Sequence, residues 1–280
     1  MHVLLSRSSL FVLPLLALVA LGHEDTRRDP IDILKVKNLL IKDYTGPLTH
    51  ETLDLFHNIE SLDLRNCNFT PFHESFLHPL PNLKRLAISN NVMERVDHDT
   101  SGCCGHLEDL ELTNSGVGDL EEVELKKIGA MRSLKRLVFH NEKIPILHED
   151  TLTDTNLVDV TIKHCNLASI EDGAFKKLQK LENLNLKKNQ LKEIKKEVLA
   201  PLTNVKVINL SGNFLEKLTT DMIPSLPNLE LLIVAHNPIK EFNLEGIKEV
   251  APKLKTVDIS GIEVDTSKSG GINLVKHAVL

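Results

Sequence analysis

Two histidines, His140 and His164, are the pair best suited by residue type and spacing to hold a metal ion or a ligand. They stand at neighbouring points of successive units of the repeat described below, which would place them on adjacent strands. Neutral imidazole is a common zinc ligand, but a catalytic zinc site needs about three protein ligands. The sequence places no carboxylate or third histidine clearly beside this pair. We therefore predict no metal site, and assign both imidazoles to a surface that binds a partner.

The motifs of the common enzyme classes are missing from the sequence. It contains no glycine-rich phosphate loop, no nucleophile elbow, no two-histidine metalloprotease helix and no zinc-finger spacing. Its acidic pairs, such as Glu121-Glu122, fit solvated segments. We predict no catalytic residue and no cofactor, so the chain is expected to bind rather than to catalyse.

A repeat of about 24 residues organises nearly the whole chain, with the pattern L-x-x-L-x-L-x-x-N/C-x-L. Apolar residues that alternate with polar ones at its fourth and sixth positions predict a short strand with one buried face. No unit can bury that face alone, so stacked units are predicted to form one domain, residues 34–265, around a parallel sheet. The first position of the pattern falls at Val36, Ile59, Leu83, Leu107, Leu134, Leu157, Leu181, Val205, Leu229 and Leu254. A longer interval includes residues 119–128, whose spacing predicts a helix.

The ninth position of each unit is predicted to be structural. An inward amide there can satisfy backbone groups that the turn leaves without partners. The position is held by Cys67, Asn91, Ser115, Cys165, Asn189, Asn213 and Asn237. Tyr44 and Ile262 depart from this rule in terminal units, which must cap the core. Glu142 departs within the array, and because a buried unpaired carboxylate is costly we predict a reshaped turn that exposes it.

The stretch from Ile170 to Leu191, with leucines at 178, 181, 184, 186 and 191 and Asn189 at the ninth position, resembles a known repeat. It is similar to the typical repeat of extracellular leucine-rich-repeat proteins, which include Toll-type receptor ectodomains, small matrix proteoglycans and secreted immune and adhesion proteins. The resemblance implies an α/β horseshoe solenoid with a concave parallel sheet that binds partners. The chain lacks the cysteine-rich caps that usually flank such arrays and shows no receptor membrane span.

The third, fifth, seventh and eighth positions are predicted to face solvent from the concave sheet. Two groups stand out there, a basic strip of lysines and histidines and an adjoining apolar patch that includes Ala235. Contiguous exposed apolar area often marks an interaction site, although the C-terminal tail could instead fold over the patch. The residues predicted to bind a partner are Arg136, Val138, His140, Lys163, His164, Lys187, Lys188, Val207, Leu231, Ile233 and His236.

The four cysteines do not fit a simple pair of disulfides. Cys67 and Cys165 occupy the same inward position four units apart, roughly 19 Å at the strand spacing, whereas a disulfide needs Cα atoms within about 7 Å. We predict that both are buried thiols. Cys103 and Cys104 are adjacent, and three states stay open: a bridge between neighbours, a free pair, or an intermolecular bridge that makes a covalent homodimer.

The first 22 residues are predicted to be a cleaved export signal. Arg7 precedes the apolar run 10–21, and Ala20-Leu21-Gly22 offers a small-x-small cleavage pattern. The run is too short, and interrupted by Pro14, to span a bilayer, which needs about 20 apolar residues. No second such run follows. The mature chain is thus predicted to be secreted and unanchored, with a short segment at 23–33 before the repeats and a tail at 266–280 after them.

The sequence also contains two glycosylation sequons, Asn68-Phe-Thr70 and Asn209-Leu-Ser211. Asn68 is predicted to be accessible. Asn209 falls at an outward strand position, so a glycan there would sit on the concave face.

Composition and fold together predict a soluble scaffold that recognises an extracellular protein or glycan, in settings such as innate immunity, development or cell adhesion. Removal of Arg7 with the signal leaves 33 − 1 = 32 basic residues against 39 acidic ones, a formal charge of −7. This acidity disfavours nucleic acid as a ligand. A structural matrix component that self-associates, with Cys103 and Cys104 as the candidate contact, is the alternative. A cytosolic scaffold is the third reading and requires that the N-terminal segment is not an export signal.

Overall fold

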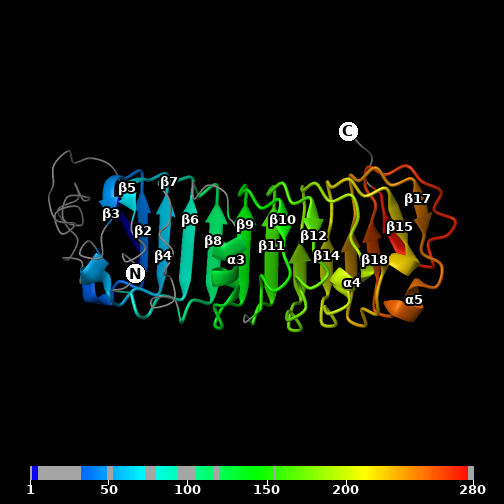
Figure 1. Ribbon diagram of the computed structural model, residues 1–280, viewed down its shortest axis with the longest axis horizontal. Helices are drawn as coiled ribbons and strands as arrows, with labels where there is room; N and C mark the ends of the chain where they lie inside the picture. Colours follow the sequence, from blue (N-terminus) through cyan, green and yellow to red (C-terminus); the bar gives the residue numbers. More distant parts are fainter. Residues whose placement is uncertain are drawn as a thin grey trace. The chain divides into compact units, whose positions relative to one another are not determined.

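The computed structural model describes residues 2–5, 33–48, 53–72, 80–93, 105–115, 120, 122–153 and 156–276, and the structural statements below concern these residues. They fall into two compact units, Met1–Gly118 and Asp119–Leu280, each described by itself. Figure 1 shows that both units consist of stacked coils that contribute successive strands to a parallel sheet. Cys103 and Cys104, and most of the predicted export signal, lie outside the described residues.

Unit 1 is a stack of short strands paired in parallel. Its main sheet has the strand order β1-β2-β4-β6-β8, and a second sheet, β3-β5-β7, follows the turns. The elements are β1 (His2–Leu5), η1 (Ile33–Lys35), β2 (Asn38–Lys42), β3 (Thr45–Leu48), η2 (Asp54–Phe56), β4 (Ser61–Arg65), β5 (Asn68–Phe72), β6 (Arg85–Ser89), β7 (Val92–Met93) and β8 (Asp109–Thr113). The strand β1, which belongs to the predicted export signal, forms the edge of the main sheet beside β2.

Unit 2 continues the same coil-by-coil construction. Its main sheet has the order β9-β11-β13-β14-β16-β18-β19, and the pairs β10-β12 and β15-β17 lie after the turns. The elements are α3 (Glu122–Gly129), β9 (Arg136–His140), β10 (Ile146–Leu147), β11 (Asp159–Lys163), β12 (Ser169–Ile170), β13 (Asn183–Asn185), α4 (Lys196–Leu199), β14 (Val207–Asn209), β15 (Lys217–Thr219), η5 (Thr220–Met222), β16 (Leu231–Ile233), β17 (Glu241–Asn243), α5 (Ile247–Val250), β18 (Thr256–Asp258) and β19 (Asn273–Val275). The helix predicted at residues 119–128 is confirmed as α3.

The strand residues alternate between the core and the outer face as the repeat predicts. In β4, Leu62 and Leu64 are fully buried while their neighbours are at least partly exposed. In β13, Leu184 is buried between the part-exposed Asn183 and Asn185. Each inward side chain packs in a coil interior that the next coil closes, which is why the units stack. The predicted parallel solenoid is confirmed.

The asparagines at the ninth position form a hydrogen-bond ladder inside the coils. The Nδ2 atom of Asn213 donates to the carbonyl oxygens of Leu186 at 3.0 Å and Leu210 at 2.8 Å, and its Oδ1 accepts from the amide of Leu191 at 3.1 Å. Asn237 repeats this pattern one coil later. The buried amide thus joins neighbouring turns through backbone groups that have no other secondary-structure partner. The predicted structural role is confirmed.

Cys67 and Cys165 replace asparagine in this ladder as buried free thiols, as predicted. The thiol of Cys165 donates to the carbonyl oxygens of Phe139 at 3.5 Å and Lys163 at 3.2 Å. Its amide donates to Oδ1 of Asn189 at 2.9 Å. A thiol is a weaker donor than an amide, so these coils keep the contact pattern of the ladder with weaker bonds.

Cys165 is expected to be chemically inert while the protein is folded. Burial raises the pKa of its thiol from 9.0 to about 11, so at neutral pH the reactive thiolate is about a hundredfold scarcer than at an ordinary cysteine. We expect iodoacetamide to label Cys165 only in denaturant, or after the pH approaches that pKa. Pulsed alkylation followed by peptide mass spectrometry measures this, and equal labelling rates in native and unfolded protein would contradict it.

The prediction that the turn at Glu142 is reshaped to expose the carboxylate is wrong. Glu142 is only 6% exposed. At the eighth position the turn keeps the left-handed backbone of the other repeats: Asn141 has φ +56° and donates its amide to the Lys163 carbonyl at 3.0 Å, as Asn66 and Asn90 do to the next coil. With this path retained, the ninth side chain points inward whatever its type.

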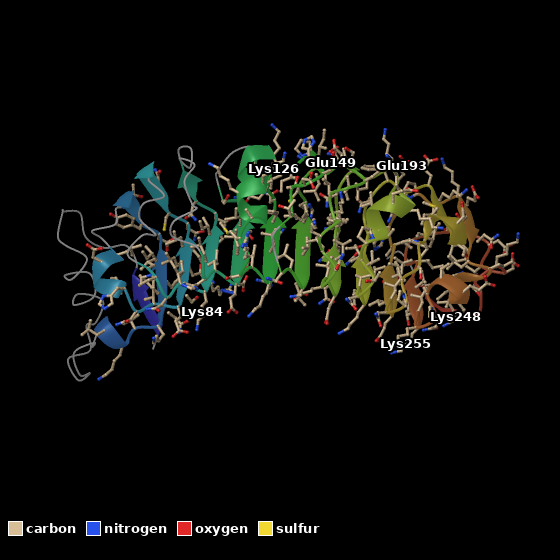
Figure 2. All side chains as sticks on the ribbon, turned by 60° about the horizontal axis from the view of Figure 1, so that its bottom comes forward. Lys84, Lys126, Glu149, Glu193, Lys248 and Lys255 are labelled. Atoms are coloured by element: carbon tan, nitrogen blue, oxygen red, sulfur yellow. The ribbon has the colours of Figure 1, made fainter. Side chains whose placement is uncertain are left out.

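A charged row follows one edge of each main sheet, at the second position of the repeat. Its members nearly alternate in sign: Lys37, Glu60, Lys84, Glu108, Lys135, Val158, Glu182, Lys206, Glu230 and Lys255. Ion pairs join Lys206 to Glu182 at 2.7 Å and Lys255 to Glu230 at 2.6 Å. Figure 2 shows Lys255 on one edge of unit 2, with Glu193 on the opposite edge. Exposed pairs contribute only about 0.2–1 kcal/mol each, so we assign the row to register between coils.

The C-terminal segment extends the main sheet of unit 2. β19 pairs in parallel with β18, and Ile272 just before it is 7% exposed. The tail up to Lys276 therefore does not cover the predicted apolar patch, which lies on β14 and β16. The helices within the described residues include none long and apolar enough to cross a membrane.

Candidate binding surface

The outer face of the unit 2 sheet arranges the predicted binding residues in rows. Neighbouring strands are in register, so Lys163 lies opposite His140 and Leu231 lies opposite Val207. Strand spacing in a sheet is about 4.8 Å. Side chains at the same position of successive repeats are therefore close enough to act on one ligand.

Lysines and histidines on β9, β11 and the turns after β11 and β13 make up what we call the cationic group: His140, Lys163, His164, Lys187 and Lys188. The imidazole centroids of His140 and His164 are 5.7 Å apart, with planes tilted by 39°. The structure thus brings together the two histidines that the sequence placed on adjacent strands. Among the described residues, no cluster of three or more histidine, cysteine or carboxylate side chains could hold a metal ion.

The three lysines of the cationic group have no acidic partner within the described part of the chain. Some lysines elsewhere in unit 2 do have one, as in the pairs Lys206–Glu182 at 2.7 Å and Lys195–Asp172 at 3.0 Å, and other described lysines outside the sheet face do not. Like charges held close together repel one another, which costs stability unless an anion binds among them. This surface therefore carries a local excess of positive charge, although the chain as a whole is acidic.

The neighbouring charges also act on His164. Although His164 is exposed, desolvation by its neighbours is the largest effect that lowers the pKa of its imidazole, followed by the positive charges of Lys188, His140, Lys163 and Lys187. His164 is therefore mainly neutral at neutral pH. Its proton is taken up only at lower pH, or when an anion offsets the surrounding charge.

Three members of the predicted surface stand where the backbone is left-handed. The eighth position has φ near +55° in repeat after repeat, a conformation that asparagine and glycine tolerate best. Its occupants are Asp43, Asn66, Asn90, Asn114, Asn141, His164, Lys188, Gly212, His236 and Gly261. His164, Lys188 and His236 depart from the aspartate, asparagine and glycine of the other repeats, and Lys188 is the least suited to this backbone.

Two glycines at the eighth position, Gly212 and Gly261, leave space for the side chain of the preceding coil. A Cβ atom added at Gly212 would lie 3.1 Å from Cγ of Lys188, and one added at Gly261 would lie 2.5 Å from Nδ1 of His236. The side chains of Lys188 and His236 therefore lie against the glycine of the next coil. This contact directs both along the row.

Val207, Leu231 and Ile233 form the apolar group, and all three are partly exposed on β14 and β16. Val207 and Leu231 are register partners, and Ile233 lies opposite Asn209. A contiguous area of three aliphatic side chains beside the cationic group can bind apolar groups.

Two apolar residues predicted to lie exposed on the unit 2 surface are buried. Val138 is 8% exposed, because it stands between Arg136 and His140 on its own strand and opposite Thr161 on the next. Ala235 is 5% exposed, since its single methyl group does not reach beyond its neighbours. Neither offers significant area to a partner. Arg136 is only partly exposed at the other end of β9, in register with Asp159.

Comparison with known proteins identifies the repeat. A family model described as leucine rich repeat matches residues 57–117 and 155–215, and the ladder and strand pattern extend over the coils between and beyond them. The matched segments are leucine-rich repeats, and the chain has the leucine-rich-repeat fold.

Solved leucine-rich-repeat structures share its fold. The LRR protein LIC12759 of Leptospira interrogans is 21% identical, with a TM-score of 0.59 over 87% of this chain and 72% of that one. The leucine-rich repeat domain of APL1B is 19% identical, with a TM-score of 0.62 over 97% and 76%. The TLR13 chain of a TLR13-ssRNA13 complex is 16% identical, with a TM-score of 0.58 over 86% and 43%. A search of curated proteins gave no match. At these identities the likeness shows the leucine-rich-repeat fold alone.

The two sequons of this leucine-rich-repeat chain differ in setting. Oδ1 of Asn209 accepts from the Ser211 amide at 3.0 Å and hydroxyl at 2.7 Å, and Ser211 is 3% exposed. Asn68 is partly exposed, and its Oδ1 is buried without a hydrogen-bond partner among the residues described. Both asparagine side chains are only partly exposed. Occupancy of either sequon stays a prediction.

The repeat analysis missed one exposed aromatic residue. Phe214 follows the ladder residue Asn213 and is 53% exposed. It occupies the tenth position, where Gln190 and Pro238 of the adjoining leucine-rich repeats are also exposed. Because the tenth position is exposed in these repeats, the presence of a phenylalanine there could have indicated an exposed aromatic side chain from the sequence alone.

Proposed function

We propose that this chain is an exported leucine-rich-repeat scaffold that recognises another protein through the outer face of its unit 2 sheet. The surface consists of the cationic group and the apolar group defined above. It has no catalytic role in this proposal, since its part is to hold a partner.

One observation carries the proposal: three lysines without acidic partners adjoin three part-exposed aliphatic side chains on a rigid sheet. On the sheet face of unit 1, by contrast, Arg85 is paired with Asp109 at 3.0 Å and with Glu111 at 3.2 Å. The unit 2 surface leaves both its charge and its apolar area available. Such a combination fits a protein interface, in which apolar contact gives affinity and complementary charge gives specificity.

Export is the second part of the proposal and rests on the N-terminal sequence. The apolar run after Arg7 and the small-x-small pattern ending at Gly22 fit a signal that is removed. We expect N-terminal sequencing of the secreted protein to begin at or near His23. Recovery of the intact chain from the cytosol would reject export.

The recognition surface is tested by the double substitution Leu231→Asp and Ile233→Asp. We expect the wild-type protein to retain a discrete heterologous partner from extracellular fluid, and the double variant to retain at least tenfold less. Leu40→Asp is the matched control, because Leu40 is a part-exposed outward leucine on β2 of unit 1. Circular dichroism and secretion level should be the same for all three proteins.

Solution mass measurement completes this experiment. A complex of fixed mass, lost in the double variant and kept in the Leu40→Asp control, supports recognition. Polymers of the chain alone that grow with concentration would instead reject recognition in favour of a self-associating structural component. Equal capture by all three proteins would also overturn the proposed surface.

A further inference from the structure

The eighth-position row shows that two members of the cationic group, His164 and Lys188, stand where the backbone favours other residues. At φ +56° an asparagine or glycine is the favoured residue, yet Lys188 holds this position between the coils of His164 and Gly212. Residues held in sparsely populated backbone conformations tend to gather at functional sites. A lysine that is unfavourable for folding at this point implies a role for its charge.

The neighbouring coil aims that charge. Gly212 has φ +66° and leaves room for the Lys188 side chain, whose Cγ lies 3.1 Å from where a Cβ would stand. Lys187 precedes Lys188 and is half-buried, and Lys163 occupies the seventh position one coil earlier. The three lysines therefore stand on adjacent coils, at the same end of the strands.

The adjoining apolar group restricts the chemistry of the ligand. Sulfated sugars and nucleic acids offer anions but little aliphatic surface, and would leave Val207, Leu231 and Ile233 uncovered. A polypeptide can present carboxylates and aliphatic side chains a few residues apart. It matches both halves of the surface at once.

Resting on the function proposed above, we infer that the unit 2 surface binds an acidic segment of its partner protein that also carries aliphatic side chains. The carboxylates of this segment lie on Lys163, Lys187 and Lys188. Its aliphatic side chains cover Val207, Leu231 and Ile233. Charge complementarity sets which partner binds, and the apolar contact sets how long it stays.

The test uses a fluorescein-labelled peptide with a run of glutamates followed by leucine and valine residues. Two control peptides replace either the glutamates with glutamine or the aliphatic residues with serine, and heparin serves as a sulfated glycan. We expect saturable binding of the first peptide in fluorescence anisotropy, weakening as salt is raised, and at least about tenfold weaker binding of both control peptides.

The variant that tests the lysines is Lys163→Gln, Lys187→Gln and Lys188→Asn together. Loss of three charge-assisted contacts should weaken peptide binding by about tenfold. The single change Lys188→Asn distinguishes a binding role of Lys188 from a structural one, because loss of a structural residue would lower Tm. It should raise Tm by about 1–4 °C, since asparagine suits the left-handed backbone, while weakening binding.

Three outcomes would overturn the inference: no saturable binding of the glutamate peptide, equal binding of its glutamine version, or heparin binding that depends on the three lysines while the peptide does not bind. A fall in Tm on Lys188→Asn would contradict the backbone argument. These results are distinct from failure of the proposed function. If the partner is still captured from extracellular fluid and is lost on Leu231→Asp with Ile233→Asp, only the assigned ligand class is wrong.

Discussion

Replacing Asn189 with alanine is expected to lower the free energy of unfolding by about 3–5 kcal/mol. Asn189 is 5% exposed, and its side-chain amide makes several hydrogen bonds to main-chain groups. Its Nδ2 donates to the carbonyl oxygens of Ile162 at 2.6 Å and Leu186 at 3.0 Å. Its Oδ1 accepts from the amides of Cys165 at 2.9 Å and Leu167 at 3.2 Å.

The physical reason is that alanine removes four partners at once from buried main-chain groups. Each buried donor or acceptor left without a partner costs about 1–3 kcal/mol, and the coil interior has no solvent to replace the amide. The chain has no tryptophan, so urea unfolding is followed by far-ultraviolet circular dichroism. Hydrogen exchange at the Cys165 amide reports the same loss locally.

Two further variants separate the ladder from general damage to the repeat. Asn189→Cys should lose about half as much stability, because Cys67 and Cys165 show that a thiol can occupy the ninth position and donate to the same kind of carbonyl. Gln190→Ala, at the exposed neighbouring residue, should change stability by less than about 0.5 kcal/mol. Equal losses for Asn189→Ala and Gln190→Ala would show that the ladder does not carry the effect.

The repeat period made the fold and the ladder predictable. A strict spacing of apolar positions fixes which side chains enter the coil, and a small polar residue at the ninth position has only backbone groups to bond there. Glu142 shows the boundary of that reasoning. Energetic cost alone predicted an exposed carboxylate, whereas the backbone path set by the neighbouring coils placed it at 6% exposure.

The outer surface was predictable as rows, but not as exposed area. Because successive strands pair in register, His140 and Lys163 had to be neighbours once the repeat was aligned. Burial at Val138 and Ala235 depends on the reach of the flanking side chains, which position in the repeat does not specify. A position can face outward and still be covered.

Some structural rows carried signals that the sequence analysis did not use. Asparagine recurs just before the first apolar position, and each of these side chains donates to a main-chain carbonyl of the preceding coil at 2.7–3.4 Å: Asn58, Asn82, Asn156, Asn204 and Asn228. Asparagine or aspartate at the eighth position likewise indicated a left-handed turn. Had the left-handed turn been predicted, Lys188 could have been recognised from the sequence as an unusual residue at that position.

Substitution of Gly270 by alanine is expected to detach the C-terminal strand β19 and to cost about 3 kcal/mol of local stability. Gly270 has φ +62°, and a Cβ atom there would lie 2.0 Å from the carbonyl oxygen of Leu244. That neighbour is backbone, held by the hydrogen bond from the Leu244 amide to the Lys268 carbonyl at 2.8 Å. It cannot move aside as a flexible side chain would.

The loss of local stability is measured by hydrogen exchange beside β18, the strand that β19 covers. The Ile259 amide donates to the Val275 carbonyl at 2.9 Å, so about 3 kcal/mol corresponds to roughly a hundredfold faster exchange of that amide. Gly271→Ala is the matched control, since Gly271 has φ +74° but open space around its Cβ position. It should cost only about 1–2 kcal/mol. If both variants exchange alike, the backbone angle and not the contact with Leu244 holds the strand.

Detachment of β19 would also affect the candidate binding surface. Without it, β18 becomes an unpaired edge, which promotes pairing with other chains. Thr256 and Asp258 of β18 are the register partners of Leu231 and Ile233, so the same strand supports the apolar group. Gly270→Ala should therefore weaken partner capture without changing any residue of the surface, whereas Gly271→Ala should leave capture near the wild-type level. Loss of capture in Gly270→Ala alone would show that the proposed surface depends on the terminal segment, because the sheet that presents Leu231 and Ile233 then lacks a covered edge.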